Sequence, residues 1–255
     1  MKGFVNNGNS CFFNTSLKAL LTVCHDLVNH ECEIQYSTFT HLFFSLLKAY
    51  YDPTIRYIDP RPLLDVFREI YPQFIEHEPH DTQECILFLI DILERDVPLF
   101  KKRFYGIREN QVIHPQGKNV STEAFSMYII DAQPNTKLTE QLDKSFKWTT
   151  IENYGVYHLA TKRSLIRVIP EVFMISFDAK SDIEVPENFI LNTQYMELVY
   201  SCMHHGDQQG GHYVCMTKHE NNWILHDDMT ILKLDNFPTK SGHYVLIYTP
   251  KTLQS

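Results

Sequence analysis

The spacing of apolar residues divides the chain into two parts. Up to about residue 105 the apolar positions recur every three or four residues, as they do on the buried side of an amphipathic helix. The first two stripes consist of Leu17, Leu20, Leu21 and Cys24, and of Phe39, Leu42, Phe43, Leu46 and Tyr50. This part of the chain is therefore predicted to be helical.

Two further helices are predicted from their start signals. Asp59 followed by Pro60 is typical of an N-cap and the first helical position, and the apolar stripe that begins at Leu63 follows directly. Asp81 is a second candidate N-cap, and Glu84 stands three residues later as the reciprocal partner of a capping box.

After about residue 105 the apolar residues form short segments that are rich in aromatic and β-branched side chains. These segments are AFSMYII (124–130), YGVYHLA (154–160), VFMISF (172–177), YMELVYSCM (195–203), HYVCMTK (212–218) and HYVLIYT (243–249). Such segments are typical of strands, and they predict an antiparallel sheet. Helices followed by strands indicate an α+β protein with a helical lobe (about 1–105), a β-rich lobe (about 106–255) and a cleft between them.

Composition narrows the class of protein. The 255 residues include 44% hydrophobic residues, enough for a packed core, and the net charge of -8 argues against a nucleic-acid partner. No apolar stretch is long enough to cross a membrane, and the N-terminus has no signal-peptide pattern. We therefore expect a cytoplasmic monomer that could also enter the nucleus.

The six cysteines are spread over the whole chain without any CxxC pair. This spacing predicts reduced thiols, no structural zinc site and no cofactor. One group nevertheless permits a metal hypothesis, because Cys24, His25, His30 and Cys32 lie close together in sequence.

Cys11 is a candidate nucleophile because it stands where a polar loop, NNGNS, enters the first predicted helix. A helix N-terminus favours the thiolate, so we expect the pKa of this thiol to be lowered. The alternative interpretation is a small buried cysteine that happens to lie near a helix start.

The tetrapeptide GHYV occurs twice and contains a candidate histidine each time, His212 and His243. A cysteine nucleophile needs an imidazole that accepts its proton and a third group that orients the ring. Asp227 and Asp228 follow His212 after a predicted strand, turn and strand, whereas no carboxylate side chain follows His243. The pattern favours His212 as the base and His243 as a structural strand residue.

Several ordered segments carry a resemblance to a known family. They are GFVNNGNSCFFNTSLKAL (3–20), PHDTQECIL (79–87), YMELVYSCMHHGDQQGGHYV (195–214), WILHDD (223–228) and YVLIY (244–248). They match the cysteine box, the Q-x-D-A-x-E-F-L box, the two parts of the histidine box and the closing strand of the ubiquitin-specific proteases. The chain resembles this family of papain-like cysteine deubiquitinases over nearly its whole length.

The resemblance implies a fold and a set of roles. The fold would be papain-like, with a helical thumb, an antiparallel β palm and reduced fingers without zinc, and the partner would be ubiquitin or a ubiquitinated protein. The implied catalytic residues are the nucleophile Cys11, the base His212, the orienting Asp227, the assisting Asp228 and the oxyanion donor Asn6. The implied substrate-binding residues are Asp81, Glu84, His205, Gly211 and Tyr213.

Three departures from the family pattern affect positions close to these residues. Pro79 replaces a glutamine, Phe12 replaces the tyrosine after the nucleophile, and His226 replaces the aromatic residue before the paired aspartates. Two alternatives to a deubiquitinase therefore stay open: a protease for another ubiquitin-like modifier, and a pseudoenzyme that binds ubiquitin without cleaving it.

Overall fold

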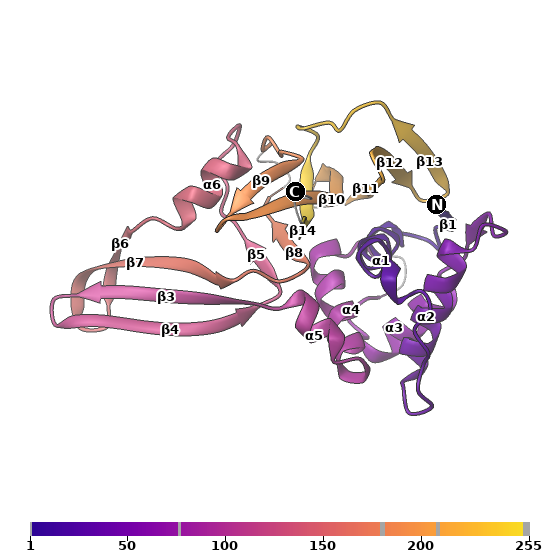
Figure 1. The fold of residues 1–255 in the computed structure, drawn as a ribbon, viewed down its shortest axis with the longest axis horizontal. Coiled ribbons are helices and arrows are strands. Elements are labelled where there is room, and N and C mark those ends of the chain that lie inside the picture. The colour runs from indigo at the N-terminus through magenta and orange to yellow at the C-terminus, as the bar shows by residue number, and fades with distance from the viewer. Residues whose placement is uncertain (1, 76–77, 179–181, 208–209, 252–255) are drawn as a thin grey trace.

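The N-terminal part of the chain folds into helices, as predicted. The computed structural model describes residues 2–75, 78–178, 182–207 and 210–251 (Figure 1). The helices of this part are α1 (Cys11–Val23), the 3-10 turn η1 (His25–Leu27), α2 (Thr38–Tyr51), α3 (Arg61–Ile70), α4 (Thr82–Asp96) and α5 (Leu99–Phe104). The apolar stripes that begin at Leu17 and Phe39 are buried in α1 and α2.

The two predicted helix starts differ in outcome. In α3 the N-cap is Pro60, so the helix begins one residue later than predicted, although Asp59 Oδ1 still accepts the N–H of Arg61 at 2.9 Å. In α4 the predicted N-cap is confirmed, because the Oδ1 of Asp81 accepts the backbone N–H groups of Gln83 and Glu84 at 2.6 and 3.2 Å, whereas the reciprocal bond to the Glu84 side chain stays a prediction.

The palm is a sheet in the order β13-β12-β11-β10-β14-β8-β5, and β9 also pairs with β10. Its strands are β5 (Met127–Ile129), β8 (Phe173–Ser176), β9 (Asn188–Leu191), β10 (Gln194–Asp207), β11 (Gly210–His219), β12 (Asn222–Asp227), β13 (Thr230–Leu234) and β14 (His243–Pro250). Within the segment matched to the histidine box, Gln208 and Gln209 lie outside the described residues.

The sheet is antiparallel as predicted except at one edge, where β5 runs parallel to β8. A parallel pair needs a long crossover connection, and here that connection contains α6 (Leu138–Ser145) and a hairpin of two strands at residues 149–154 and 157–168. Because β5 and β8 are not joined by a short turn, the local sequence does not predict that they pair.

A second sheet projects from the palm as an arm, the fingers, on the left of Figure 1. Its strands lie in the order β4-β3-β7-β6. They are β3 (Gly106–His114), β4 (Gly117–Phe125), β6 (Thr149–Tyr154) and β7 (Tyr157–Val168). At the tip the ring of His114 stacks on the ring of Tyr157, with 4.6 Å between centroids. Aromatic contacts thus join the two hairpins at this end of the arm.

Two segments that we predicted to be single strands are divided in the structure. Segment 124–130 contains the end of β4 and all of β5, which belong to different sheets. Segment 154–160 is interrupted by the hairpin between β6 and β7, where Gly155 has a φ of 59°. A left-handed backbone conformation at this glycine reverses the chain there. Because apolar residues stand on both sides of it, the sequence pattern does not indicate the turn.

The N-terminus is tied to the palm close to the cleft. Strand β1 (Gly3–Phe4) pairs in parallel with β2 (Tyr57–Ile58), and the N–H of Phe4 donates to the carbonyl of Asp228 at 2.9 Å. A Cβ on Gly3 would lie 2.5 Å from the carbonyl oxygen of Met229, so only glycine allows this approach. The turn after β12 is therefore held next to the loop that precedes α1.

Helix α1 is the element that joins the lobes, because it packs on α4 on one side and on β10 and β11 on the other. Its residues are almost entirely buried, and the helix therefore carries its polar side chains into the interior.

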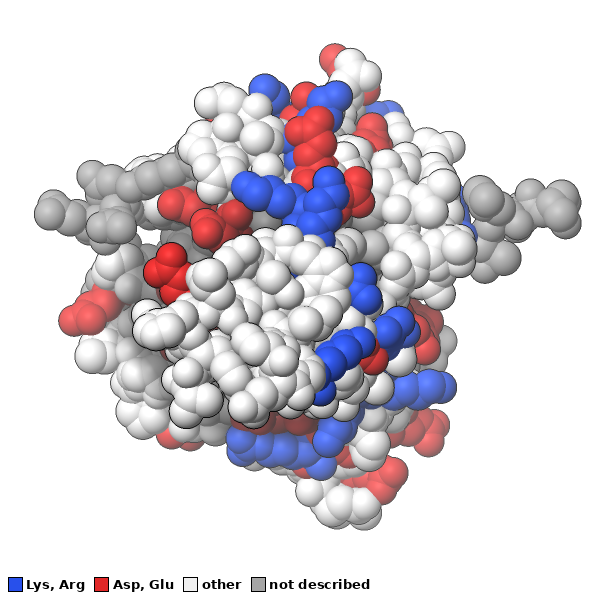
Figure 2. All heavy atoms as spheres, turned by 90° about the vertical axis from the view of Figure 1, so that its left-hand side faces the viewer, with Lys and Arg blue, Asp and Glu red and all other residues white. Residues whose placement is uncertain are grey.

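Charged side chains of both signs surround an uncharged area on the fingers side of the molecule (Figure 2). No helix among the described residues has the length and apolarity required to span a membrane.

Candidate active site

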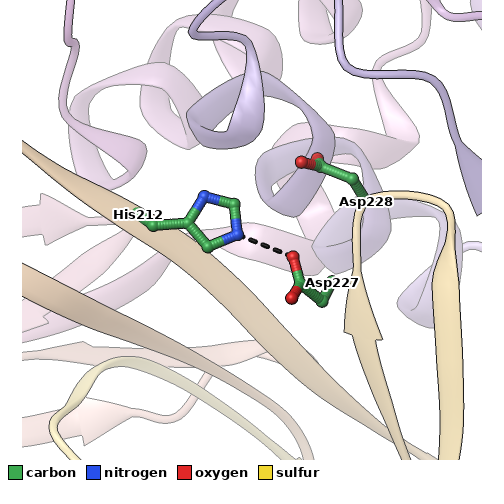
Figure 3. A group of neighbouring side chains, drawn as sticks. All are labelled: His212, Asp227 and Asp228. Carbon is green, nitrogen blue, oxygen red and sulfur yellow. Dashed lines mark hydrogen bonds and ion pairs between the residues drawn. The ribbon is translucent and has the colours of Figure 1, made fainter.

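His212 and Asp227 meet at the edge of the palm. His212 lies near the start of β11 and Asp227 ends β12, the neighbouring antiparallel strand. Figure 3 shows His212 Nε2 directed at Asp227 Oδ1, and the distance between these atoms is 2.6 Å. A carboxylate only accepts hydrogen bonds at neutral pH, so Nε2 carries the proton and Nδ1 stays available as a base. The predicted return of an aspartate to this histidine is confirmed.

Cys11 is the first residue of α1, and the backbone N–H of Tyr213 is directed at its thiol. Because Tyr213 directly follows His212 on β11, this contact brings the nucleophile candidate to the strand that carries the base candidate. The side chain of Cys11 is 8% exposed, so a substrate carbonyl would meet it from one side only.

The pKa of Cys11 differs in direction from the expectation. Burial raises this pKa, and it outweighs the N–H groups of Tyr213, Phe12 and Cys11 itself, which act to lower it. The charge of Asp228 adds to the increase. The N–H groups at the helix N-terminus act in the predicted direction, but their effect on the pKa is smaller than the cost of placing a thiolate in the interior.

Asn6 is fixed by the loop that precedes α1. Its Oδ1 accepts the backbone N–H and the hydroxyl of Ser10, both at 3.2 Å, and its Nδ2 donates to Asp228 Oδ2 at 2.7 Å. The loop turns at Gly8, where φ is 70°. The Nδ2 atom carries a second hydrogen, and an amide held on three sides can present it to a developing oxyanion.

Asp228 is occupied by two asparagines. Its Oδ1 accepts from Nδ2 of Asn14 and its Oδ2 from Nδ2 of Asn6, each at 2.7 Å. The sequence analysis missed Asn14, which lies one helical turn after Cys11 on α1. A polar residue between Phe13 and Leu17 at this spacing was the available signal, because a buried amide requires partners.

The two acids predicted to bind the ubiquitin tail, Asp81 and Glu84, lie at the start of α4. Asp81 caps α4 through Oδ1 and accepts the hydroxyl of Tyr244 through Oδ2, which ties the thumb to β14. The side chain of Glu84 is exposed. Both oxygens of Asp81 are therefore engaged before any substrate arrives.

The remaining predicted substrate-binding residues lie on the hairpin of β10 and β11. His205 is exposed and is the cross-strand partner of His212. A Cβ on Gly211 would lie 2.2 Å from Nε2 of His204, so the close packing of that ring requires glycine. Tyr213 packs its ring against His204 at 4.6 Å between centroids.

His243 has the contacts of a structural residue. It is 1% exposed, its Nε2 lies 2.8 Å from the carbonyl of Pro238, and its Nδ1 lies 2.8 Å from the hydroxyl of Ser201. A carbonyl only accepts, so Nε2 carries the proton and Nδ1 accepts from Ser201. Burial lowers the pKa of His243 to about 4, which keeps the ring neutral.

The three departures from the family pattern fall in different environments. Phe12 is buried and packs against Phe74 and His80, with 5.8 and 5.1 Å between ring centroids. Pro79 is exposed at the entrance to α4. His226 is 2% exposed, and its Nε2 lies 2.9 Å from the hydroxyl of Thr217.

One group of side chains brings several potential metal ligands together. Among the described residues, the only His, Cys, Asp and Glu atoms that approach within 4.8 Å of one another as a group of three belong to His212, Asp227 and Asp228. The hydrogen bonds above already engage all three, as expected for an oriented imidazole. The sequence cluster from Cys24 to Cys32, whose members are all described, is not such a group.

The comparisons with known proteins agree with one another. The family model described as "Ubiquitin carboxyl-terminal hydrolase" matches residues 2–248. "Ubiquitin carboxyl-terminal hydrolase 5" and "Ubiquitin carboxyl-terminal hydrolase 9" of Arabidopsis thaliana are each 28% identical over 116 residues. These matches cover 41% of this chain and only 13% of each relative.

Solved structures match over the whole chain. The SAGA DUB module Ubp8/Sgf11/Sus1/Sgf73 bound to monoubiquitin gives a TM-score of 0.86 at 18% identity, and the match covers 100% of this chain and 70% of that one. The same module bound to ubiquitin aldehyde gives 0.82 at 18% identity with the same coverage. At this identity the likeness establishes the fold, and it confirms the predicted α+β architecture.

Proposed function

The chain belongs to the ubiquitin carboxyl-terminal hydrolase family, and we propose that it is a cysteine deubiquitinase that hydrolyses the peptide or isopeptide bond after the C-terminal glycine of ubiquitin. The observation that supports this most is the meeting of α1 with the distant hairpin of β11 and β12. Helix α1 carries Cys11, β11 carries His212, and β12 carries Asp227 within 2.6 Å of the histidine. We propose the roles of nucleophile, base and orienting acid for these residues.

In the proposed reaction the thiol of Cys11 gives its proton to Nδ1 of His212 and its sulfur attacks the glycine carbonyl. The carbonyl oxygen becomes an oxyanion, which accepts a hydrogen bond from Nδ2 of Asn6. Collapse breaks the carbon–nitrogen bond, the leaving amine takes the proton from His212, and a thioester on Cys11 remains. A water molecule that loses a proton to His212 then hydrolyses the thioester and restores the thiol.

The raised pKa of Cys11 fits this sequence of steps. A thiol whose pKa is raised requires an adjacent base at the moment of attack, and Asp227 keeps His212 oriented for that transfer. We further propose that the carboxylates of Asp81 and Glu84 attract the basic tail of ubiquitin. The net charge of -8 supports an attraction of this sign.

The proposal is tested with ubiquitin that carries an electrophile at its C-terminus. Wild-type protein should form a covalent adduct, Cys11→Ala should form none, and Cys32→Ala serves as the control because it removes a partly exposed thiol elsewhere. Parallel reactions with other ubiquitin-like modifiers identify the preferred substrate. An adduct on Cys11→Ala, or none on the folded wild type, would refute the proposed function.

A further inference from the structure

A small cavity lies beside the turn that carries Asp228. The residues that line it are Asn14, Thr15 and Lys18 of α1, Cys215 of β11, His226 of β12, Asp228 and Phe4. The volume open to the centre of a water molecule is about 10 Å³. That volume is close to the minimum for one water molecule, and a water in a protein interior needs two to four polar partners.

Two polar atoms of the cavity residues need a partner. Asn14 and His226 are 3% and 2% exposed, and within the described part of the chain neither Asn14 Oδ1 nor His226 Nδ1 has a hydrogen-bond partner. The other polar atoms of both side chains are bound, because Asn14 Nδ2 reaches Val5 O at 3.2 Å and Asp228, and His226 Nε2 reaches Thr217. Buried polar atoms are normally satisfied, by ordered water where protein groups are absent.

Lys18 supplies donor capacity to the same cavity. Its side chain is 2% exposed, and its Nζ donates to the carbonyl of Lys2. Nζ lies 3.9 Å from the ring centroid of Phe4 and 4.4 Å from that of Tyr50. The Lys18 nitrogen carries three N–H groups as an ammonium and two as an amine, and the carbonyl uses one of them, so in either state another can point into the cavity that the lysine lines.

We propose that one ordered water molecule binds in this cavity, accepts a hydrogen bond from Lys18 Nζ and donates to Asn14 Oδ1 and His226 Nδ1. In this arrangement each donor is matched by an acceptor. Burial lowers the pKa of His226 well below its usual value, so the ring is neutral, and a proton on Nε2 can donate to Thr217 while Nδ1 accepts.

The water acts on the active site through Asn14, and this part of the inference rests on the proposed function. Val5 O and Asp228 are acceptors and already require Nδ2 of Asn14 on the side of the carboxylate, and a hydrogen bond from the water to Oδ1 holds the amide in that orientation from its other end. Asp228 in turn holds Asn6, the proposed oxyanion donor. Lys18 and His226 are therefore positioning residues, since neither touches the reacting atoms.

The catalytic test uses Lys18→Met and His226→Phe, which keep side-chain size and remove one water contact each. Lys218→Met, a partly buried lysine of the same sheet, is the matched control. On ubiquitin with a fluorogenic C-terminal amide, kcat should fall about ten-fold in each variant with KM within about two-fold of wild type. The double variant should be no slower than the slower single variant, because both act through one water.

Alkylation of Cys11 by iodoacetamide separates the oxyanion donor from the nucleophile. This reaction forms no oxyanion, so its rate in both variants should stay within about two-fold of wild type. Unchanged kcat in folded variants, additive losses, or alkylation that falls in step with kcat would each overturn the positioning role.

A high-resolution crystal structure of the wild-type protein tests the water without any activity. We expect a density peak within hydrogen-bond distance of Lys18 Nζ, Asn14 Oδ1 and His226 Nδ1. Absence of that peak would overturn the site even if the protein proved to be an active deubiquitinase. Presence of the peak in a protein that cleaves nothing would instead leave the site standing and refute the proposed function.

Discussion

Lys18 should make the stability of this protein depend on pH. Burial lowers the pKa of its ammonium to about 7, whereas a lysine in the unfolded chain keeps its ordinary value of 10.5. Between these two pH values the unfolded chain holds a proton that the folded chain has released. The free energy of unfolding therefore rises with pH across this window, by up to about 1.4 kcal/mol for each pH unit. Below pH 7 both states are protonated, and the full cost of burying the charge is present.

The substitution Lys18→Met removes this dependence and keeps most of the side-chain volume. From pH 7 to pH 9 the wild type should gain about 2 kcal/mol of unfolding free energy relative to the variant, because Lys18 is still half protonated at pH 7. Urea unfolding at pH 6, 7, 8 and 9, followed by tryptophan fluorescence, measures the difference, and groups that titrate in both proteins cancel. Lys101→Met, at an exposed position, should give a difference that does not vary with pH. A constant difference for Lys18→Met as well would refute the assignment of a buried, easily deprotonated lysine.

Four further outcomes are expected. His212→Ala should abolish turnover with little change in Tm. His243→Ala should instead cost about 1–3 kcal/mol of stability, because it leaves the buried partners Ser201 and Pro238 unsatisfied, and it should keep kcat in the folded fraction. Equal catalytic loss in equally folded proteins would contradict this assignment. Asp81→Asn should raise KM and preserve the helix cap. Tyr244→Phe should lower Tm, because it removes the hydrogen bond to Asp81. Unchanged kcat/KM in the first variant and unchanged Tm in the second would show that Asp81 matters neither to the substrate nor to the tie with Tyr244. Alkylation of Cys11 should still accelerate above pH 9, and a plateau below pH 7 would show that the thiolate exists at rest. Dialysis against a chelator should leave activity and Tm unchanged, and loss of either would reveal a metal.

Periodicity and short motifs determined much of this protein. The helical stripes in α1 and α2 and the strands around His212 and His243 follow from side-chain spacing, because burial on one face imposes that spacing locally. The cap at Asp81 is local for the same reason. The candidate Cys11 could be named from the sequence because a polar loop enters a predicted helix there. His212 and Asp227 could be named because a strand, a turn and a second strand bring the chain back beside itself.

Contacts between distant segments decided the rest. The parallel pairing of β5 with β8 and the tie between Asp81 and Tyr244 join residues with long stretches of chain between them, which local patterns do not encode. The direction of the Cys11 pKa shift is of this kind too, because desolvation depends on everything packed around the thiol. The sequence predicts a helix N-terminus at Cys11, but only the folded molecule determines whether that positive end outweighs burial.

The same reason explains the residues that the sequence analysis missed. Asn14 and Lys18 lie on a buried helix, and nothing adjacent in the chain indicates that Asp228 and a cavity lie against them. Polar side chains in an interior are stabilised by partners that arrive from other elements, and those partners are fixed only when α1, β11 and β12 pack together.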